Sequence, residues 1–222
     1  MSTATTNRHQ ELIDKLPPAS TLILHDIGWE EYEELLDALG EAKGLRISYD
    51  QGTLQIMTLS TRHEKYARLI DNLVSLFSIR MRIKVLCYGS ATMKKHDKLR
   101  GAEPDSCFYV QNADLVGRKS DIDFSIDPPP DIVVEVDLGH DSVSKFPVYS
   151  ELGVPEIWRY DGEFITIYHL IGERYVTASA SHALPALSSD ILTEFLSRSN
   201  HEDQYEVLLA FETWLQAHEP AS

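Results

Sequence analysis

The stretch from residue 130 to residue 137, PDIVVEVD, constrains the fold more than any other part of this sequence. Its β-branched residues favour a strand, and the side chains of a strand alternate between two faces. One face then carries Ile132, Val134 and Val136, and the other carries Asp131, Val133, Glu135 and Asp137. Carboxylates that leave water must be paired, protonated or bound to a metal. The pattern therefore predicts either an edge strand with one wet face or a divalent-metal site on a buried sheet.

The length and composition are typical of one folded domain. The chain has 222 residues, of which 43% are hydrophobic and 25% charged. We expect a flexible N-terminal lead over residues 1–20 and a single domain over residues 21–222. No apolar run approaches the roughly 20 residues of a membrane helix, and the first ten residues lack the apolar segment of a secretory signal. Cys87 and Cys107 have no paired spacing, which indicates buried thiols in a reducing, cytoplasmic compartment.

The charge is strongly acidic but unevenly distributed. A formal net charge of -15 argues against general binding to nucleic acid or anionic membranes. From Arg80 to Arg100, however, seven basic residues accompany a single acid, Asp97. This segment is either a surface for the DNA backbone or an ordinary solvated surface. The residues that would contact the DNA backbone are Arg82, Lys84, Lys94, Lys95, Lys98 and Arg100.

Hydrophobic periodicity and turn residues predict an α/β core with antiparallel additions. Helices are expected over residues 29–39, 61–81, 144–152, 190–196 and 205–217. Strands are expected over residues 45–49, 53–58, 83–88, 105–110, 131–137, 156–160, 164–170 and 175–179, with an irregular loop over 111–130. Gly52 supplies the positive φ of a hairpin turn. Ser60 or Thr61 caps the second helix, with Glu64 placed for a capping box with Thr61.

Two of the acids are candidates for metal binding. Asp105 begins one predicted strand, and Glu135 lies on a strand that we expect to be its neighbour. Hard cations such as Mg²⁺ take oxygen ligands and keep several waters. A cation on two such carboxylates lowers the pKa of a bound water and neutralises charge on a phosphate.

Several segments of the chain resemble the motifs of a large bacterial family of predicted endonucleases. These segments are EPD at 103–105, PDIVVEV at 130–136, Lys145 and Tyr149, and GVPEIW at 153–158. The family is the Uma-two family, formerly a domain of unknown function, within the PD-(D/E)XK superfamily, and the resemblance covers roughly residues 28–197. It implies a restriction-endonuclease-like fold, with a mixed central sheet flanked by helices. It also implies a DNA endonuclease that depends on Mg²⁺ or Mn²⁺ and acts as a homodimer.

The resemblance assigns roles to individual residues. Asp105 corresponds to the metal-binding aspartate and Glu135 to the acid of the (D/E)XK strand. The lysine expected two residues later is Asp137 here, and Lys145 occupies the position to which the family's lysine has moved. Glu64 resembles the additional helical acid of the superfamily, although the capping box would also explain it.

Several alternatives remain open at this point. Asp137 is either a further metal ligand or a sign of altered activity, and Asp131 is either a site residue or the start of its strand. His63 is either a general base or a partly exposed helix residue. Asp137 and the net charge also favour a non-catalytic nuclease-fold module that binds nucleic acid or protein. A metal-dependent hydrolase of another phosphate ester is the third reading.

Overall fold

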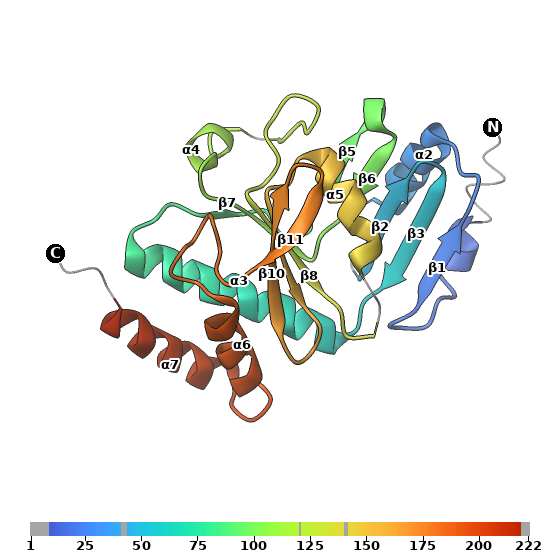
Figure 1. The fold of residues 1–222 in the computed structure, drawn as a ribbon. Coiled ribbons are helices and arrows are strands. Elements are labelled where there is room, and N and C mark those ends of the chain that lie inside the picture. Colours follow the sequence, from blue (N-terminus) through green and yellow to red (C-terminus); the bar gives the residue numbers. More distant parts are fainter. Residues whose placement is uncertain (1–8, 41–43, 120, 140–141, 219–222) are drawn as a thin grey trace.

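The computed structural model describes residues 9–40, 44–119, 121–139 and 142–218. Two β-sheets lie beside one another, and helices cover them (Figure 1). This arrangement confirms the predicted mixed α/β fold. Among the described residues, no helix is both long and apolar enough to cross a membrane.

The strands fall into two sheets. The strands are β1 (Thr21–Leu24), β2 (Leu45–Asp50), β3 (Thr53–Thr58), β4 (Leu86–Cys87), β5 (Met93–Lys95), β6 (Arg100–Ala102), β7 (Ser106–Tyr109), β8 (Ile132–Val136), β9 (Glu156–Tyr160), β10 (Ile165–Ile171) and β11 (Arg174–Ala178). One sheet has the order β1-β3-β2-β6-β5, and the other has the order β11-β10-β9-β8-β7-β4. The second sheet is mixed, because β8 and β9 run parallel while all its other pairs of neighbouring strands are antiparallel.

The helices follow from the same amphipathic patterns. They are α2 (Trp29–Leu39), α3 (Thr61–Met81), α4 (Ala113–Val116), α5 (Phe146–Leu152), α6 (Ser189–Arg198) and α7 (Gln204–Ala217), with short 3-10 segments η1 (His96–Lys98) and η2 (Ser142–Lys145). The long helix α3 runs along the six-stranded sheet, and α7 packs beside it (Figure 1). The two C-terminal helices and the β9-β10-β11 meander confirm the predicted elements.

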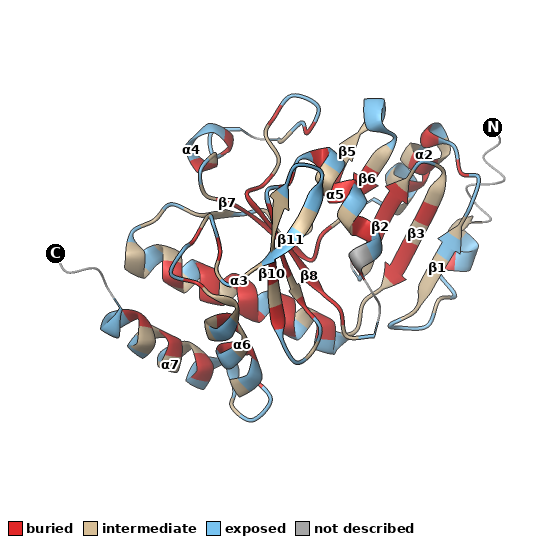
Figure 2. Cartoon of the chain, in the orientation of Figure 1, coloured by how far each residue is buried: buried red, intermediate tan, exposed pale blue. Residues whose placement is uncertain are grey.

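Strand β8 lies in the interior of the six-stranded sheet, and every residue of it is buried (Figure 2). Ile132, Val134 and Val136 pack in the core that α3, α6 and α7 cover, whereas Val133 packs with α5 on the opposite face. The predicted alternation of faces is therefore confirmed. The alternative of an edge strand with one wet face is wrong, because β7 and β9 flank β8 on both sides.

The five-stranded sheet packs against α2. Trp29, Tyr32 and Leu35 of this helix are buried against β2 and β3. The predicted hairpin is confirmed, and both Gln51 and Gly52 in its turn have positive φ. Strand β1, which the sequence did not predict, adds to β3.

The N-terminal segment that we expected to be a flexible lead packs against the five-stranded sheet from residue 9 onward. Residues 9–13 are helical, and Ile13 is buried in the core of this sheet. The backbone N–H of Ser20 donates to the side chain of Thr58 at 3.0 Å. The burial of Ile13 and this hydrogen bond attach the part of the segment from residue 9 onward to the sheet, whereas residues 1–8 lie outside the described part of the chain.

The start of α3 corrects one sequence interpretation. Ser60 is the cap, and its hydroxyl accepts from the backbone N–H of His63 at 3.2 Å. The third helical residue is then His63, so Glu64 takes no part in a capping box. The presence of Glu64 on the first turn of α3 therefore needs another explanation.

Two further expectations differ from the structure. The strand predicted over residues 83–88 is only the two-residue β4, and the basic segment after it forms the β5-β6 hairpin. The loop predicted over residues 111–130 contains the short helix α4. Short elements such as these carry too few residues for a periodic pattern.

Candidate active site

Asp105 lies between β6 and β7, where the chain passes from one sheet to the other, and it is fully buried. Its Oδ1 accepts from Nε of Arg46 at 3.0 Å, and its Oδ2 accepts from the backbone N–H of Val136 at 2.8 Å. Nε2 of His63 lies 3.0 Å from the same Oδ2. Burial alone would raise the pKa of Asp105, but His63, Lys145 and Arg46 outweigh it and lower this pKa. Asp105 is therefore held as a carboxylate.

Glu135 lies on β8, directly beside the strand that follows Asp105, and is also buried. Nζ of Lys145 donates to its Oε2 at 2.9 Å and to its Oε1 at 3.1 Å, and the hydroxyl of Tyr149 donates to Oε1. Burial raises the pKa of Glu135 to about 7; repulsion from Asp105 adds to this, and Lys145 opposes it. Glu135 therefore changes its protonation state close to neutral pH.

The pairing of β7 with β8 brings these two acids to the same centre. Asp105 directly precedes β7; its backbone N–H donates to the carbonyl of Val134 at 3.0 Å, and its Oδ2 accepts from the backbone N–H of Val136. Glu135 lies between these two residues of β8, and the charge of Asp105 helps to raise the pKa of Glu135. The structure therefore places the two candidate metal-binding acids together.

Lys145 is the last residue of η2 and is buried beside Glu135. Burial alone would lower the pKa of Lys145, but Glu135 and Asp105 outweigh it and raise this pKa. The ammonium is therefore held charged next to the two acids. The pairing of Lys145 with Asp141, which a surface role would require, involves a residue outside the described part of the chain.

Arg46 is a site residue that sequence reasoning missed. It comes from β2 of the other sheet, is buried, and bridges Asp105 to Glu64 through contacts of 3.0 Å and 3.4 Å. Its one signal in the sequence is an arginine between apolar residues in a predicted strand. Glu64 is half-exposed and also lies 3.6 Å from Nε of Arg68. The helical acid thus joins the site through Arg46, not through a direct contact with Asp105.

His63 lies on the first turn of α3 with its ring buried. Its Nδ1 is buried, and no described residue is its hydrogen-bond partner. The expectation of a partly exposed helix residue is therefore wrong. Ser60 caps this turn, and Nε2 of His63 lies beside Oδ2 of Asp105, which also accepts from the backbone N–H of Val136 at the end of β8.

Asp131 and Asp137 have structural partners. Asp131 accepts from the backbone N–H groups of Val110 and Gln111 at 2.6 Å and 3.0 Å. Asp137 accepts from the N–H and hydroxyl of Ser142, each at 3.0 Å, and from Nε of Arg159 at 2.5 Å. The acid at the motif-lysine position therefore holds Ser142, the first residue of the η2 segment that ends at Lys145.

The basic residues predicted to contact DNA are dispersed and largely neutralised. Lys84 pairs with Asp114 of α4, whereas the other paired basic residues lie on or next to the β5-β6 hairpin and contact groups of α2, α5 and β2. These remaining contacts are Lys94 with Glu33, Lys98 with Glu151, Arg100 with Asp50, and Lys95 with the carbonyl of Leu152. Arg82 caps the end of α3 in the left-handed conformation. The local charge excess in the sequence is thus balanced by acids from other elements.

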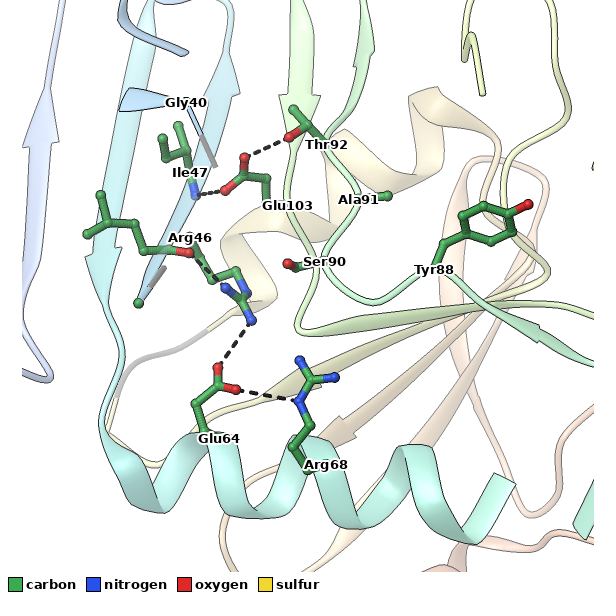
Figure 3. Close-up of a pocket in the computed structure, with 12 residues that line it drawn as sticks. Gly40, Arg46, Ile47, Glu64, Arg68, Tyr88, Ser90, Ala91, Thr92 and Glu103 are labelled. Atoms are coloured by element: carbon green, nitrogen blue, oxygen red, sulfur yellow. Dashed lines mark hydrogen bonds and ion pairs between the residues drawn. The ribbon is translucent and has the colours of Figure 1, made fainter. Parts of the chain in front are cut away.

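A cavity of about 690 Å³ lies in front of this centre. Its lining includes Arg46, Glu64, Arg68, Tyr88, Thr92 and Glu103. Arg46, Glu64 and Arg68 form an ion-paired group on one side, and the ring of Tyr88 points away from these side chains (Figure 3). Since Arg46 lines the cavity and contacts Asp105, Asp105 lies directly behind this part of the cavity wall.

The donors at this centre suit a hard divalent cation. Within the described ranges, no three His, Cys, Asp or Glu side chains are grouped so as to enclose an ion. Mg²⁺ needs only one or two carboxylates, because it keeps several waters. Asp105 and Glu135 offer two carboxylates from adjacent strands, and their mutual repulsion, which raises the pKa of Glu135, is what a divalent charge relieves.

Comparison with known proteins identifies the family. The sequence matches the profile of the Uma2 family, described as "putative restriction endonuclease", over residues 29–214. The chain belongs to the Uma2 family. The resemblance seen in the sequence is therefore confirmed, and with it the nuclease character of the fold. No curated protein matches the chain.

A solved structure supports the Uma2 fold independently. It is described as "a putative nuclease belonging to DUF820" from Anabaena variabilis ATCC 29413. The two share 13% sequence identity with a TM-score of 0.53, and the match covers 77% of this chain and 99% of the other. At this identity the likeness establishes the shared fold alone.

Proposed function

We propose that this Uma2 protein is a divalent-metal-dependent endonuclease that hydrolyses phosphodiester bonds in DNA. The observation that carries the proposal is the meeting of Asp105, Glu135 and Lys145 in one buried centre, although each comes from a different element. A set of two acids and a lysine on adjacent strands and a following helical turn supports phosphodiester hydrolysis better than a purely structural role.

Asp105 and Glu135 would hold the Mg²⁺ or Mn²⁺ ion. When bound there, the ion would lower the pKa of a water ligand and neutralise charge on the phosphate. Lys145 adds a fixed positive charge beside the acids, where it can stabilise negative charge that develops on the phosphate. Tyr149 and the backbone N–H of Val136 fix the orientations of Glu135 and Asp105. These contacts hold the two acids in fixed orientations.

A non-catalytic nuclease-fold module is the second candidate, and two contacts favour it. Arg46 and Lys145 already balance the charges of Asp105 and Glu135. Asp137 stands where the motif has lysine and is bound to Arg159. A metal-dependent hydrolase of another phosphate ester is the remaining candidate. By analogy with folds that cut both strands, we expect a homodimer acting in the cytoplasm, with residues 21–222 as one domain.

Cleavage of DNA by the purified protein tests the proposal. Supercoiled plasmid and linear DNA are incubated with Mg²⁺ or Mn²⁺, with EDTA as the metal-free arm. Nicking that disappears in EDTA and in Asp105→Asn, but persists in the exposed control Asp37→Asn, is the expected result. Metal binding without cleavage would support the module. Hydrolysis of a small phosphodiester without cleavage of DNA would support the third candidate.

A further inference from the structure

Both oxygens of Asp105 have partners in the structure. Oδ2 accepts from the backbone N–H of Val136 at 2.8 Å and lies 3.0 Å from Nε2 of His63. Oδ1 accepts from Nε of Arg46 at 3.0 Å. A carboxylate oxygen has two lone pairs, so the two contacts at Oδ2 leave this atom little capacity for a further ligand. The oxygen that can accept a divalent cation is therefore Oδ1, which Arg46 contacts.

Arg46 also separates Asp105 from the cavity. Asp105 is 0% exposed, whereas Arg46 is 6% exposed and lines the cavity of about 690 Å³. An ion that comes from this cavity meets the guanidinium before it meets the carboxylate. Two cations on one buried carboxylate repel each other strongly, because the protein interior screens charge less than water does. An ion that binds Asp105 from this side thus requires Arg46 to move.

Glu64 offers Arg46 a second acid. Nη2 of Arg46 lies 3.4 Å from Oε1 of Glu64, and Figure 3 shows the two groups facing each other. A charge-assisted N–H···O bond is usually about 2.7–2.9 Å long, so this contact can shorten. The side chain of Glu64 is 38% exposed, which gives it room to adjust. A small displacement of the guanidinium would therefore replace Asp105 by Glu64 as its main partner.

This exchange of partners keeps every charge paired. A buried charge that loses its partner is strongly destabilising. A cation on Asp105 neutralises that carboxylate, and Glu64 at the same time neutralises Arg46. The exchange also gives a reason for the acid on the first turn of α3, where Ser60 caps the helix without Glu64.

We infer that Arg46 is a positioning residue that holds Asp105 until a divalent cation binds, and that Glu64 then receives the guanidinium. The inference rests on the proposed function for the ion. It gives Glu64 a role through Arg46 and not as a ligand of the ion. The ion pair of Arg46 with Asp105, which a non-catalytic module would keep permanently, is then the metal-free state of the site.

Titration calorimetry with Mn²⁺, without DNA, tests the inference through a double-mutant cycle. The variants are Arg46→Gln, Glu64→Gln and the double variant, and thermal unfolding establishes that each is folded. Arg68→Gln is the matched control, because Arg68 lines the same cavity and lies 3.6 Å from Glu64. This control removes a positive charge from the cavity wall and keeps the pair of Arg46 with Asp105.

Glu64→Gln should weaken Mn²⁺ binding about tenfold, because Arg46 loses the acid that receives it. Arg46→Gln should bind Mn²⁺ about tenfold more tightly, and in its background Glu64→Gln should change the affinity by less than about twofold. Arg68→Gln should stay within about threefold of the parent, since an exposed ion pair contributes little. An equal loss for Glu64→Gln in both backgrounds would overturn the inference, because Glu64 would then act on the ion directly. Weaker binding by Arg46→Gln would overturn it as well.

A second readout uses the parent protein and keeps the test decisive if Arg46→Gln does not fold. The Nε–H resonance of Arg46, assigned by comparison with Arg46→Lys, reports on the contact with Asp105. Exchange of this proton with water should become at least about tenfold faster when Mg²⁺ saturates the protein. Equal protection with and without Mg²⁺ would overturn the inference and leave the proposed nuclease function standing. If neither Mn²⁺ nor Mg²⁺ binds, the inference and the metal dependence of the proposed function both fail.

Discussion

Nζ of Lys145 lies 2.9 Å from Oε2 of Glu135 and 3.1 Å from its Oε1, and both side chains are buried. A buried charge that loses its partner is strongly destabilising, so each member of this pair depends on the other. Asp105 adds a second acid to the same field, which raises the pKa of both Glu135 and Lys145. Four predictions follow from this centre and its surroundings.

Replacing Lys145 by Met should remove most cleavage. The loss should be on the order of 10²-fold or more, because a positive charge that stabilises the reacting phosphate has gone. Affinity for Mn²⁺ should stay the same or rise, since a cation next to the two acids has been removed. Single-turnover cleavage and calorimetry measure the two effects. Lys15→Met changes an exposed lysine and is the control. If Lys145→Met cleaves as fast as this control, Lys145 is not the lysine of the motif.

Replacing Glu135 by Gln should keep the fold and weaken metal binding. The amide preserves the shape of the side chain but lacks the charge that a divalent ion requires. Titration calorimetry with Mn²⁺ measures the affinity, and Glu173→Gln in the exposed β10-β11 turn is the matched control. Unchanged Mn²⁺ affinity in Glu135→Gln would make Glu135 a purely structural residue.

The raised pKa of Glu135 predicts that stability depends on pH in EDTA and that Glu135→Gln reduces this dependence. Burial raises the pKa of Glu135 from 4.5 to about 7. Because the folded-state value is the higher one, the contribution of Glu135 to stability is complete below pH 4.5 and is lost as the pH rises to about 7. Glutamine does not ionise and escapes this loss. Urea unfolding at several pH values should show Glu135→Gln gaining on the parent across that window by a few kcal/mol.

Glu135→Gln loses the ion pair with Lys145, and this lowers its stability at every pH. The test is therefore how the unfolding free energy changes with pH, and not its value at any single pH. Curves of unfolding free energy that run parallel from pH 4.5 to 7 would contradict the raised pKa of Glu135.

Replacing Asp131 by Ala should reduce stability and leave metal binding unchanged. The carboxylate accepts two backbone N–H groups, from Val110 and Gln111, and both would lose a charged acceptor. The expected cost is about 2–4 kcal/mol in urea unfolding, with a smaller cost for Asp131→Asn, whose amide oxygen still accepts. A drop in Mn²⁺ affinity without loss of stability would instead place Asp131 among the metal ligands.

Local sequence patterns predicted those elements whose residues follow a regular period or a known turn motif. The alternation along β8, the hairpin at Gly52, the long helix α3 and the C-terminal helices all follow from periodicity and turn chemistry within one segment. The choice of Ser60 over Thr61 as the helix cap was not decided by the sequence. Both residues can accept a backbone N–H, and only the path of the preceding chain selects one of them.

The sequence by itself determined the family, the two faces of β8, and the residue types Asp105, Glu135 and Lys145. Only the tertiary structure decided that Arg46, 59 residues before Asp105, closes the front of the centre, and that acids from distant elements neutralise much of the basic segment. It also decided that Asp131 and Asp137 serve as anchors. The physical reason is range: side-chain periodicity acts within a segment, whereas ion pairing depends on which segments the packed sheets bring within a few ångströms.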